Sequence, residues 1–204
     1  MACCQGQDFD RMFDARRARR DMRAYSKRGA RGATRRLLDA VQASMRERGT
    51  TGFTHLDIGG GVGVLQHELA RDGAVQTTAV DASRPYLQLL RQAAAARGYE
   101  ARQRRIDGDF TQVADSVEPA TIVTLDKVIC CYPDMVTLVR ASAREAHGAL
   151  RHRYPARHGV GPRHCPSHQL VPAARAALAV PGVHSFASGD RPSVCRGRAR
   201  PGSG

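Results

Sequence analysis

A glycine-rich turn preceded by an acidic residue is the segment of this sequence with the clearest chemical meaning. Residues 56–63 read LDIGGGVG, which places Asp57 two residues before Gly59 and four before Gly61. Glycines let a ligand approach backbone N–H groups closely, and the start of a following helix favours negative charge. The dinucleotide fingerprint also requires a glycine at position 64, where this chain has Val64. The turn therefore predicts a cofactor site that does not take a dinucleotide.

The acid before the turn indicates which cofactor this is. A carboxylate at Asp57 would repel a pyrophosphate but would attract an ammonium or a sulfonium group. S-adenosylmethionine (SAM) carries both of these cations. Farther along the chain, Asp81 and Ala82 end a second apolar run, where the carboxylate can accept hydrogen bonds from both ribose hydroxyls.

Two further acids complete the series. Asp109 can accept a hydrogen bond from an adenine amino group, and Phe110 can cover the ring. Asp126 follows a fourth apolar run. The alternative interpretation is an ordinary scaffold whose acids are only solvated.

The elements that must position these residues alternate along the chain. Apolar runs predict strands at 53–58, at 77–80, ending near 106, and at 121–125. Helical periodicity separates them at 64–73, 83–98 and 135–148. This order predicts an α/β fold with a Rossmann-like, doubly wound parallel sheet and a ligand at the carboxyl ends of its strands.

The segments on either side of this core differ from it. Residues 1–50 predict a helical cap, with helices over 8–25 and 34–49, and residues 51–150 form the βαβ domain. Residues 151–204 contain nine basic residues, one acid and no sustained periodicity, so their composition predicts a disordered basic tail.

Composition limits the function classes. The 204 residues have a net charge of +13, 42% hydrophobic and 5% aromatic side chains, which excludes an acidic disordered protein and a collagen-like one. No apolar run is long enough to cross a membrane, and acids near the N-terminus argue against a signal peptide, so we expect a cytoplasmic protein. Neither adjacent cysteine pair, at 3–4 or 130–131, has metal-binding spacing, so no metal site is predicted.

Taken together, the motifs DIGGGVG, VDAS, GDF and TLDKVICCYPD resemble those of class I SAM-dependent methyltransferases. With the N-terminal CCQG and FDARRARRDMRAY, residues 3 to about 148 resemble more narrowly the magnesium-protoporphyrin IX methyltransferase-like group. The porphyrin enzymes have a histidine directly before the Tyr-Pro of the last motif, whereas this chain has Cys131.

The resemblance implies a role for each motif. Asp57, Gly59 and Gly61 would hold the methionine end of SAM, while Asp126 and Cys131 would face the reaction centre. Residues 81–82 would contact the ribose, and residues 109–110 the adenine.

The first helix has candidates for acceptor binding. Its arginines at 16, 17, 20 and 23 could clamp an acceptor carboxylate, with Tyr25 as a catalytic residue near the methyl path. A solvated helix face and a packing tyrosine are the alternatives.

The resemblance thus implies a methyltransferase acting on a small molecule, with a porphyrin-like carboxylate as the acceptor and no specific nucleic-acid partner. The alternative is an RNA-binding protein or RNA methyltransferase that uses the arginine-rich segments. Residues 126–129, DKVI, lack the [DN]-P-P-[YF] motif of amino-directed nucleic-acid methylation, which argues against the latter. A salt titration of RNA binding distinguishes the two.

The end of the βα pattern has a possible cause in the gene. A class I sheet has seven strands, whereas the periodic pattern here ends after four and leaves the domain incomplete. Residues 155–169 can be encoded so that reading one base later gives PRDTAWVRAIALRI, an amphipathic sequence like that of the same family. We therefore expect a frameshift between residues 146 and 154, which would make this chain inactive.

Overall fold

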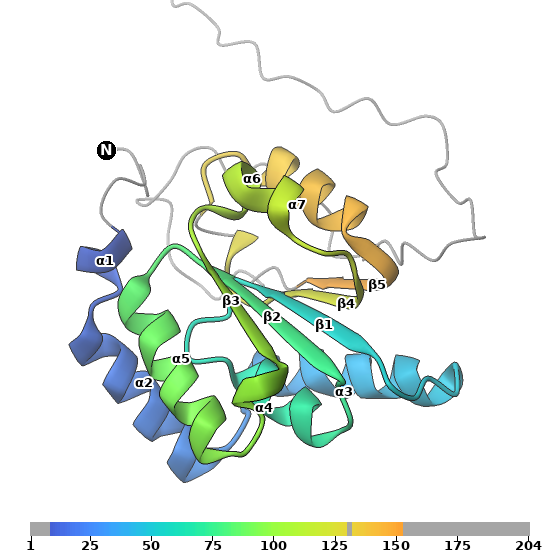
Figure 1. The fold of residues 1–204 in the computed structure, drawn as a ribbon, viewed down its shortest axis with the longest axis horizontal. Helices are drawn as coiled ribbons and strands as arrows, with labels where there is room; N and C mark the ends of the chain where they lie inside the picture. The colour runs from blue at the N-terminus through green and yellow to red at the C-terminus, as the bar shows by residue number, and fades with distance from the viewer. Residues whose placement is uncertain (1–8, 130–131, 153–204) are drawn as a thin grey trace, which may run out of the picture.

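The structure is a computed structural model that describes residues 9–129 and 132–152 (Figure 1). Its helices are α1 (Phe9–Met12), α2 (Ala15–Arg28), α3 (Gly32–Glu47), α4 (Val64–Arg71), α5 (Arg84–Ala96), α6 (Phe110–Val113) and α7 (Met135–Arg144). Its strands are β1 (Thr54–Ile58), β2 (Gln76–Asp81), β3 (Gln103–Asp107), β4 (Ala120–Leu125) and β5 (Ala146–His152).

The strands form one parallel sheet in the order β3-β2-β1-β4-β5. The chain moves outward from β1 through β2 to β3 and then returns to place β4 on the other side of β1. In such sheets the ligand binds at the carboxyl ends where the strand order reverses, here between β1 and β4. The predicted Rossmann-like α/β fold is confirmed.

The number of strands corrects the prediction of a sheet that ends after the fourth strand. α7 ends at Arg144, and β5 begins at Ala146, where the sequence predicts a continuing helix. Residues 146–152, AHGALRH, contain no β-branched residue, so sequence propensity does not mark them as a strand. β5 pairs in parallel with β4, and β4 is therefore not an edge strand.

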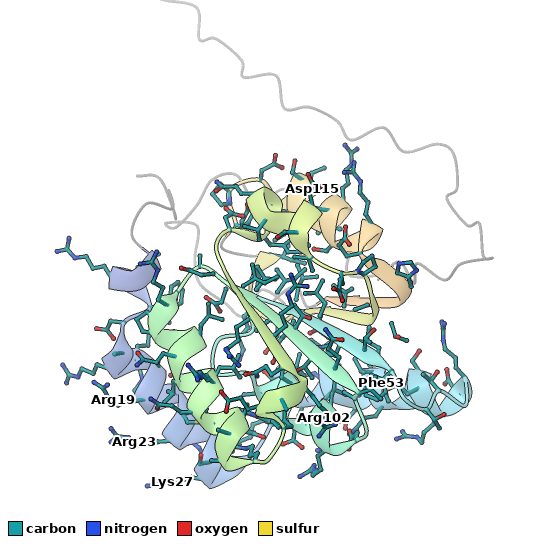
Figure 2. All side chains as sticks on the ribbon, viewed as in Figure 1. Arg19, Arg23, Lys27, Phe53, Arg102 and Asp115 are labelled. Atoms are coloured by element: carbon teal, nitrogen blue, oxygen red, sulfur yellow. The ribbon has the colours of Figure 1, made fainter. Side chains whose placement is uncertain are left out.

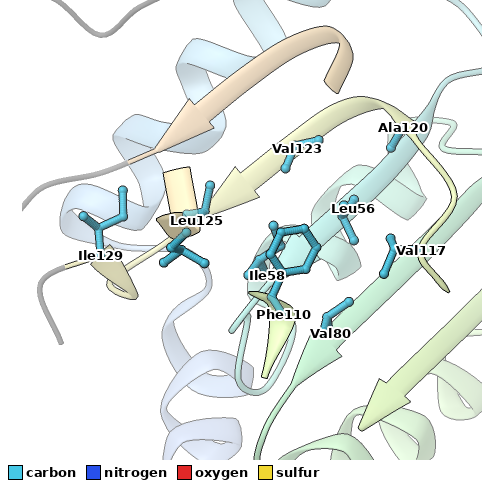
Figure 3. Packing of buried hydrophobic residues seen from close by; sticks show 10 residues of the cluster. Leu56, Ile58, Val80, Phe110, Val117, Ala120, Val123, Leu125 and Ile129 are labelled. Carbon is cyan, nitrogen blue, oxygen red and sulfur yellow. The ribbon is translucent and has the colours of Figure 1, made fainter. Parts of the chain in front are cut away.

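The two faces of the sheet are chemically different because side chains alternate along each strand. On the face covered by α6 and α7, Leu56 and Ile58 of β1 join Val123 and Leu125 of β4 in an apolar cluster (Figure 3). On the face covered by α3, α4 and α5, β1 contributes His55 and Asp57, β4 contributes Thr124, and all three are buried.

The helices before β1 are part of this packing. Leu37, Leu38 and Val41 of α3 share an apolar cluster with Phe53 before β1 and Ile122 of β4. Side chains of α2 pack against α5, where the buried Ala18 meets Tyr86. The helices before β1 thus share apolar clusters with the sheet and with α5.

One boundary in this region differs from the prediction of a single helix over 8–25. The structure separates α1 from α2 at Asp14, whose side chain accepts a hydrogen bond of 2.7 Å from the backbone N–H of Arg17. Aspartate is a favoured residue at the start of a helix because it satisfies such a free N–H group. Asp14 therefore begins a new helix and does not continue the first.

No helix within residues 9–129 and 132–152 is long and apolar enough to span a bilayer. From residue 153 onward, the segment predicted as a disordered basic tail lies outside the described residues. Both cysteine pairs also lie outside them.

The shared core predicts that α3 and the sheet unfold together. Leu38 is fully buried, so Leu38→Ala should destabilise the protein by about 2–5 kcal/mol. Urea unfolding followed by circular dichroism should show one transition, shifted as a whole to lower urea. The exposed Arg36 on the same helix is the control, and Arg36→Ala should leave the midpoint nearly unchanged. Two separate transitions, with only one shifted by Leu38→Ala, would contradict a shared core.

Candidate functional site

The glycine turn joins β1 to α4 in a conformation that requires glycine. Gly59, Gly61 and Gly63 have φ angles of 61°, 58° and 74°. A Cβ atom at Gly63 would lie 2.2 Å from Leu90 Cδ1, and one at Gly59 would lie 2.6 Å from Val128 Cγ2. The turn therefore packs its backbone closely against neighbouring side chains at the carboxyl edge of the sheet.

Asp57 lies beneath this turn. A Cβ atom at Gly60 would lie 2.0 Å from Asp57 Oδ2, and the aspartate is only 1% exposed. Thr124 Oγ1 donates to Asp57 Oδ1 at 2.7 Å, whereas Oδ2 has no hydrogen-bond partner within the described residues. Burial, reinforced by the charges of Asp126 and Asp81, raises the pKa of Asp57 to about 7. The carboxyl group of Asp57 therefore lies directly below the backbone of the turn.

Asp81 links the turn to the next strand. Its Oδ2 accepts a hydrogen bond of 3.1 Å from the Gly61 N–H, and its Oδ1 accepts one of 2.9 Å from the Ser83 N–H. These two bonds fix the orientation of the carboxylate against the turn and the start of α5. Asp81 and the adjacent Ala82 are partly exposed, which leaves them accessible at the edge.

Asp109 and Phe110 follow β3 but have different surroundings. Asp109 Oδ1 accepts hydrogen bonds from the Thr111 N–H at 3.0 Å and from Tyr132 Oη at 2.6 Å. Phe110 is 3% exposed and belongs to the apolar cluster with Ile58. The prediction that Phe110 covers a bound ring is corrected, because its ring packs into the core and has no open face.

Asp126 follows β4 and is held by a residue from the N-terminal helices. Thr34 Oγ1 of α3 donates to Asp126 Oδ2 at 2.5 Å, and Lys127 Nζ lies 3.5 Å from the same oxygen. Asp57 lies near the end of β1, Asp81 ends β2 and Asp126 follows β4, so the three acids lie at the carboxyl edge of the sheet. The charges of Asp126 and Asp81 both act on Asp57. This arrangement matches the predicted acidic series.

Tyr25 lies elsewhere. Its hydroxyl donates to Glu68 Oε1 at 3.0 Å, and its ring stacks on His67 with centroids 5.4 Å apart. The guanidinium of Arg97, which caps the end of α5 farthest from Ser83, lies 5.5 Å from the Tyr25 ring centroid. Tyr25 therefore packs near the amino ends of the strands, which corrects its predicted catalytic role. Cys131, the other candidate, lies outside the described residues.

The four candidate arginines of α2, at 16, 17, 20 and 23, are all exposed. Figure 2 shows Arg19, Arg23 and Lys27 pointing outward from α2. Arg17 stays near the start of its helix, with its guanidinium 4.8 Å from the Phe13 ring centroid. The structure thus favours a solvated face for Arg23 over a carboxylate clamp.

Several contacts at the edge were not predicted from the sequence. Ser83 Oγ donates to the Phe13 carbonyl at 2.7 Å, and Tyr86 Oη donates to Asp21 Oδ2 at 2.6 Å. These bonds tie α2 to the start of α5, beside Asp81. The only signal in the sequence was Ser83, a polar residue shortly after the second strand. It predicted the start of a helix but no contact with a distant segment.

The charge of this edge determines what it can bind. Asp57, Asp81 and Asp126 surround a turn whose N–H groups are partly taken up by Asp81 itself. A pyrophosphate would meet repulsion from these carboxylates, whereas a cationic group would be attracted. The donor set therefore fits a cofactor with positive charge and hydroxyl groups.

Comparisons with known proteins agree with this fold. Residues 56–152 match the methyltransferase domain family. A crystal structure of a candidate S-adenosyl-L-methionine-dependent methyltransferase from Methanococcus maripaludis superposes with a TM-score of 0.57 at 22% identity, over 74% of this chain and 66% of that one. Magnesium protoporphyrin IX methyltransferase from Synechocystis PCC 6803, with bound SAH, gives 0.53 at 22% identity, over 70% and 67%.

No curated protein matches the chain. The chain spans only about two thirds of the length of these two structures, and identities this low establish the fold alone. The family match and the five-stranded parallel sheet nevertheless lead to one conclusion. Residues 56–152 match the methyltransferase domain family, and the described residues have the Rossmann-like fold seen in SAM-dependent methyltransferases.

Proposed function

We propose that this chain binds SAM at the carboxyl edge of the sheet and transfers its methyl group to a small molecule. The observation that carries the proposal is the hydrogen bond between Asp81 and the Gly61 N–H. It brings an acid suited to ribose hydroxyls against a turn suited to the amino-acid end of the cofactor. The family match over residues 56–152 supports the same reaction class.

The residues at the edge fit this cofactor. The backbone of Gly59 and Gly61 would hold the methionine end, Asp81 and Ala82 the ribose, and Asp109 the adenine amino group. When bound, the sulfonium supplies a methyl group already activated for attack by a nucleophile. Asp81 and Asp126 provide negative charge at this edge that favours the cation.

The chain's contribution to the reaction would be alignment and exclusion of water. Val62 of the turn packs with Phe13, Ala18 and Met22 of the N-terminal helices, so an apolar layer covers one side of the turn. Thr34 orients Asp126 from a second helix. Holding the acceptor close to an activated methyl group in a dry site accounts for much of the acceleration in such reactions.

For the acceptor, we propose a carboxylate of a porphyrin-like compound. A carboxylate is ionised at pH 7 and needs no strong base. The resemblance of residues 3 to about 148 to the magnesium-protoporphyrin group supports this class of acceptor. The Synechocystis enzyme of similar fold has magnesium protoporphyrin IX in its name, although its identity of 22% limits that comparison to the fold.

The ribose role predicts a clear effect of Asp81→Asn. A hydrogen bond to a charged acceptor contributes ~1.5–3 kcal/mol, so losing the charge should weaken SAM binding roughly 10- to 150-fold. Isothermal titration calorimetry of the purified chain measures this. The exposed Asp115, labelled in Figure 2, is the control, and Asp115→Asn should bind as the unchanged chain does. Equal affinities for both variants would reject the ribose role.

The acceptor class predicts that the chain with its reading frame restored transfers a methyl group from radiolabelled SAM to magnesium protoporphyrin IX. Its dimethyl ester, in which both carboxylates are blocked, is the matched control and should accept no methyl group. Methylation of the ester at the same rate would show that the methyl group is transferred to an atom other than a carboxylate oxygen. Label in neither compound, from a chain that binds SAM, would contradict the proposed acceptor.

We also propose that the reading frame changes between residues 146 and 154, which would leave this chain without the rest of the domain. The composition of residues 151–204 and the shifted-frame peptide PRDTAWVRAIALRI support this. Sequencing the coding DNA should give that peptide when the frame is moved by one base. Stop codons or a polar sequence in the shifted frame would contradict it. A restored frame should raise the melting temperature and strengthen SAM binding.

A further inference from the structure

A chain of three buried polar side chains crosses the sheet below the glycine turn. His55 and Asp57 lie on the same face of β1, and Thr124 of the neighbouring β4 lies beside them, in register with Asp57. All three are at most 1% exposed. His55 Nε2 lies 2.8 Å from Thr124 Oγ1, which lies 2.7 Å from Asp57 Oδ1.

The direction of these hydrogen bonds follows from counting protons. Thr124 has one hydroxyl proton and donates it to Asp57. While Thr124 donates to Asp57, its oxygen can only accept from His55, which places the imidazole proton on Nε2 in that arrangement. Burial agrees with a neutral ring, because it lowers the pKa of His55 to about 3. His55 Nδ1 and Asp57 Oδ2, at the two ends, have no hydrogen-bond partner within the described residues.

We propose that His55 and Thr124 are positioning residues for Asp57, and that the chain couples SAM binding to the release of one proton. Without ligand, Asp57 holds a proton because its carboxyl group is buried beneath Gly60. A cation bound above the turn favours the carboxylate. The O–H bond of Asp57 then breaks, its electron pair stays on the carboxylate, and the proton passes to buffer. The inference rests on the proposed SAM site.

The surroundings of Asp57 support an ionisation near neutral pH. The acids Asp81 and Asp126 oppose its charge from the ends of β2 and β4, while Gln66 of α4 favours it. The charge of Asp57 also contributes to raising the pKa of Tyr99, which follows α5. Lys127 Nζ lies 3.5 Å from Asp126 Oδ2. Besides Thr124, the groups that act most strongly on Asp57 itself are these two acids and Gln66, so a cation bound above the turn would favour its charged form. A pKa of about 7 is consistent with this balance.

The first experiment needs no ligand. Because the folded pKa of Asp57 is raised from 3.8 to about 7, its stabilising effect is present at low pH and is lost as pH rises through 7. His55 has the opposite effect, lost as pH falls from 6.5 toward 3. The free energy of unfolding measured in urea, taken as the value for Asp57→Asn minus the value for the unchanged chain, should therefore rise with pH and level off above about pH 7. A flat difference between pH 5 and 9 overturns the proposal.

Thr124 variants test the positioning role. Thr124→Val keeps the shape but removes the proton donated to the carboxylate, so the midpoint of the Asp57 titration should move up by about one pH unit or more. Thr124→Ser keeps the donor and should restore the midpoint. The carboxyl carbon signal of Asp57 in NMR reports this midpoint in folded protein, independently of stability. Equal midpoints for the valine and serine variants overturn the role of Thr124.

The coupling itself is measured by calorimetry with SAM in two buffers of different ionisation enthalpy. Binding should release up to one proton and tighten about tenfold from pH 6 to pH 8, and Asp57→Asn should abolish both effects. SAM binding that releases no proton overturns the coupling but keeps the proposed function. Absence of SAM binding from pH 6 to pH 9 overturns the proposed function, while the ligand-free titration still decides whether Asp57 holds the proton.

Discussion

The pairing of β1 with β4 is the constraint on which the site depends. It is the point where the strand order reverses, and it brings Thr124 next to Asp57 in register. The glycine turn can cover Asp57 only because Gly60 has no side chain, since a Cβ atom there would overlap the carboxylate. Asp81 then fastens the turn from the other neighbouring strand through the Gly61 N–H. Strand order, turn and acids therefore depend on one another.

The two faces of the sheet divide stability and function between them. The face under α6 and α7 is apolar and supplies conventional core packing. The opposite face buries polar groups, which is costly unless each is hydrogen-bonded. Five buried side-chain atoms lack a partner within the described residues, and all belong to that face or to α4 above it: those of His55, Asp57, Gln66, His67 and Thr77. Of these five groups, Asp57 is the one that lies directly below the glycine turn, so its unpaired oxygen is the one that bears on the proposed ligand site.

Local chemistry explains how much the sequence predicts. Apolar runs between turn residues predicted four of the five strands and the acids that end them, because strand ends are local features. β5 was missed because its pairing with β4, and not its residue types, makes it a strand. From the sequence, Phe110 and Tyr25 were predicted to contact the ligands. The sequence around an aromatic residue does not show which distant residues it packs against. The His55–Thr124 bond could not be predicted, since it joins residues 69 positions apart.

The N-terminal helices lie outside the residues that match the methyltransferase family, but they contact the candidate site. They precede residues 56–152, yet Thr34 holds Asp126, and Ser83 and Tyr86 bind the backbone and side chains of the segment around α2. A fold shared by many enzymes does not determine an acceptor, because specificity lies in the residues added around the common site. These contacts place added residues directly against the carboxyl edge. Residues that distinguish this edge from that of other proteins with the same fold are therefore expected first in the helices before β1.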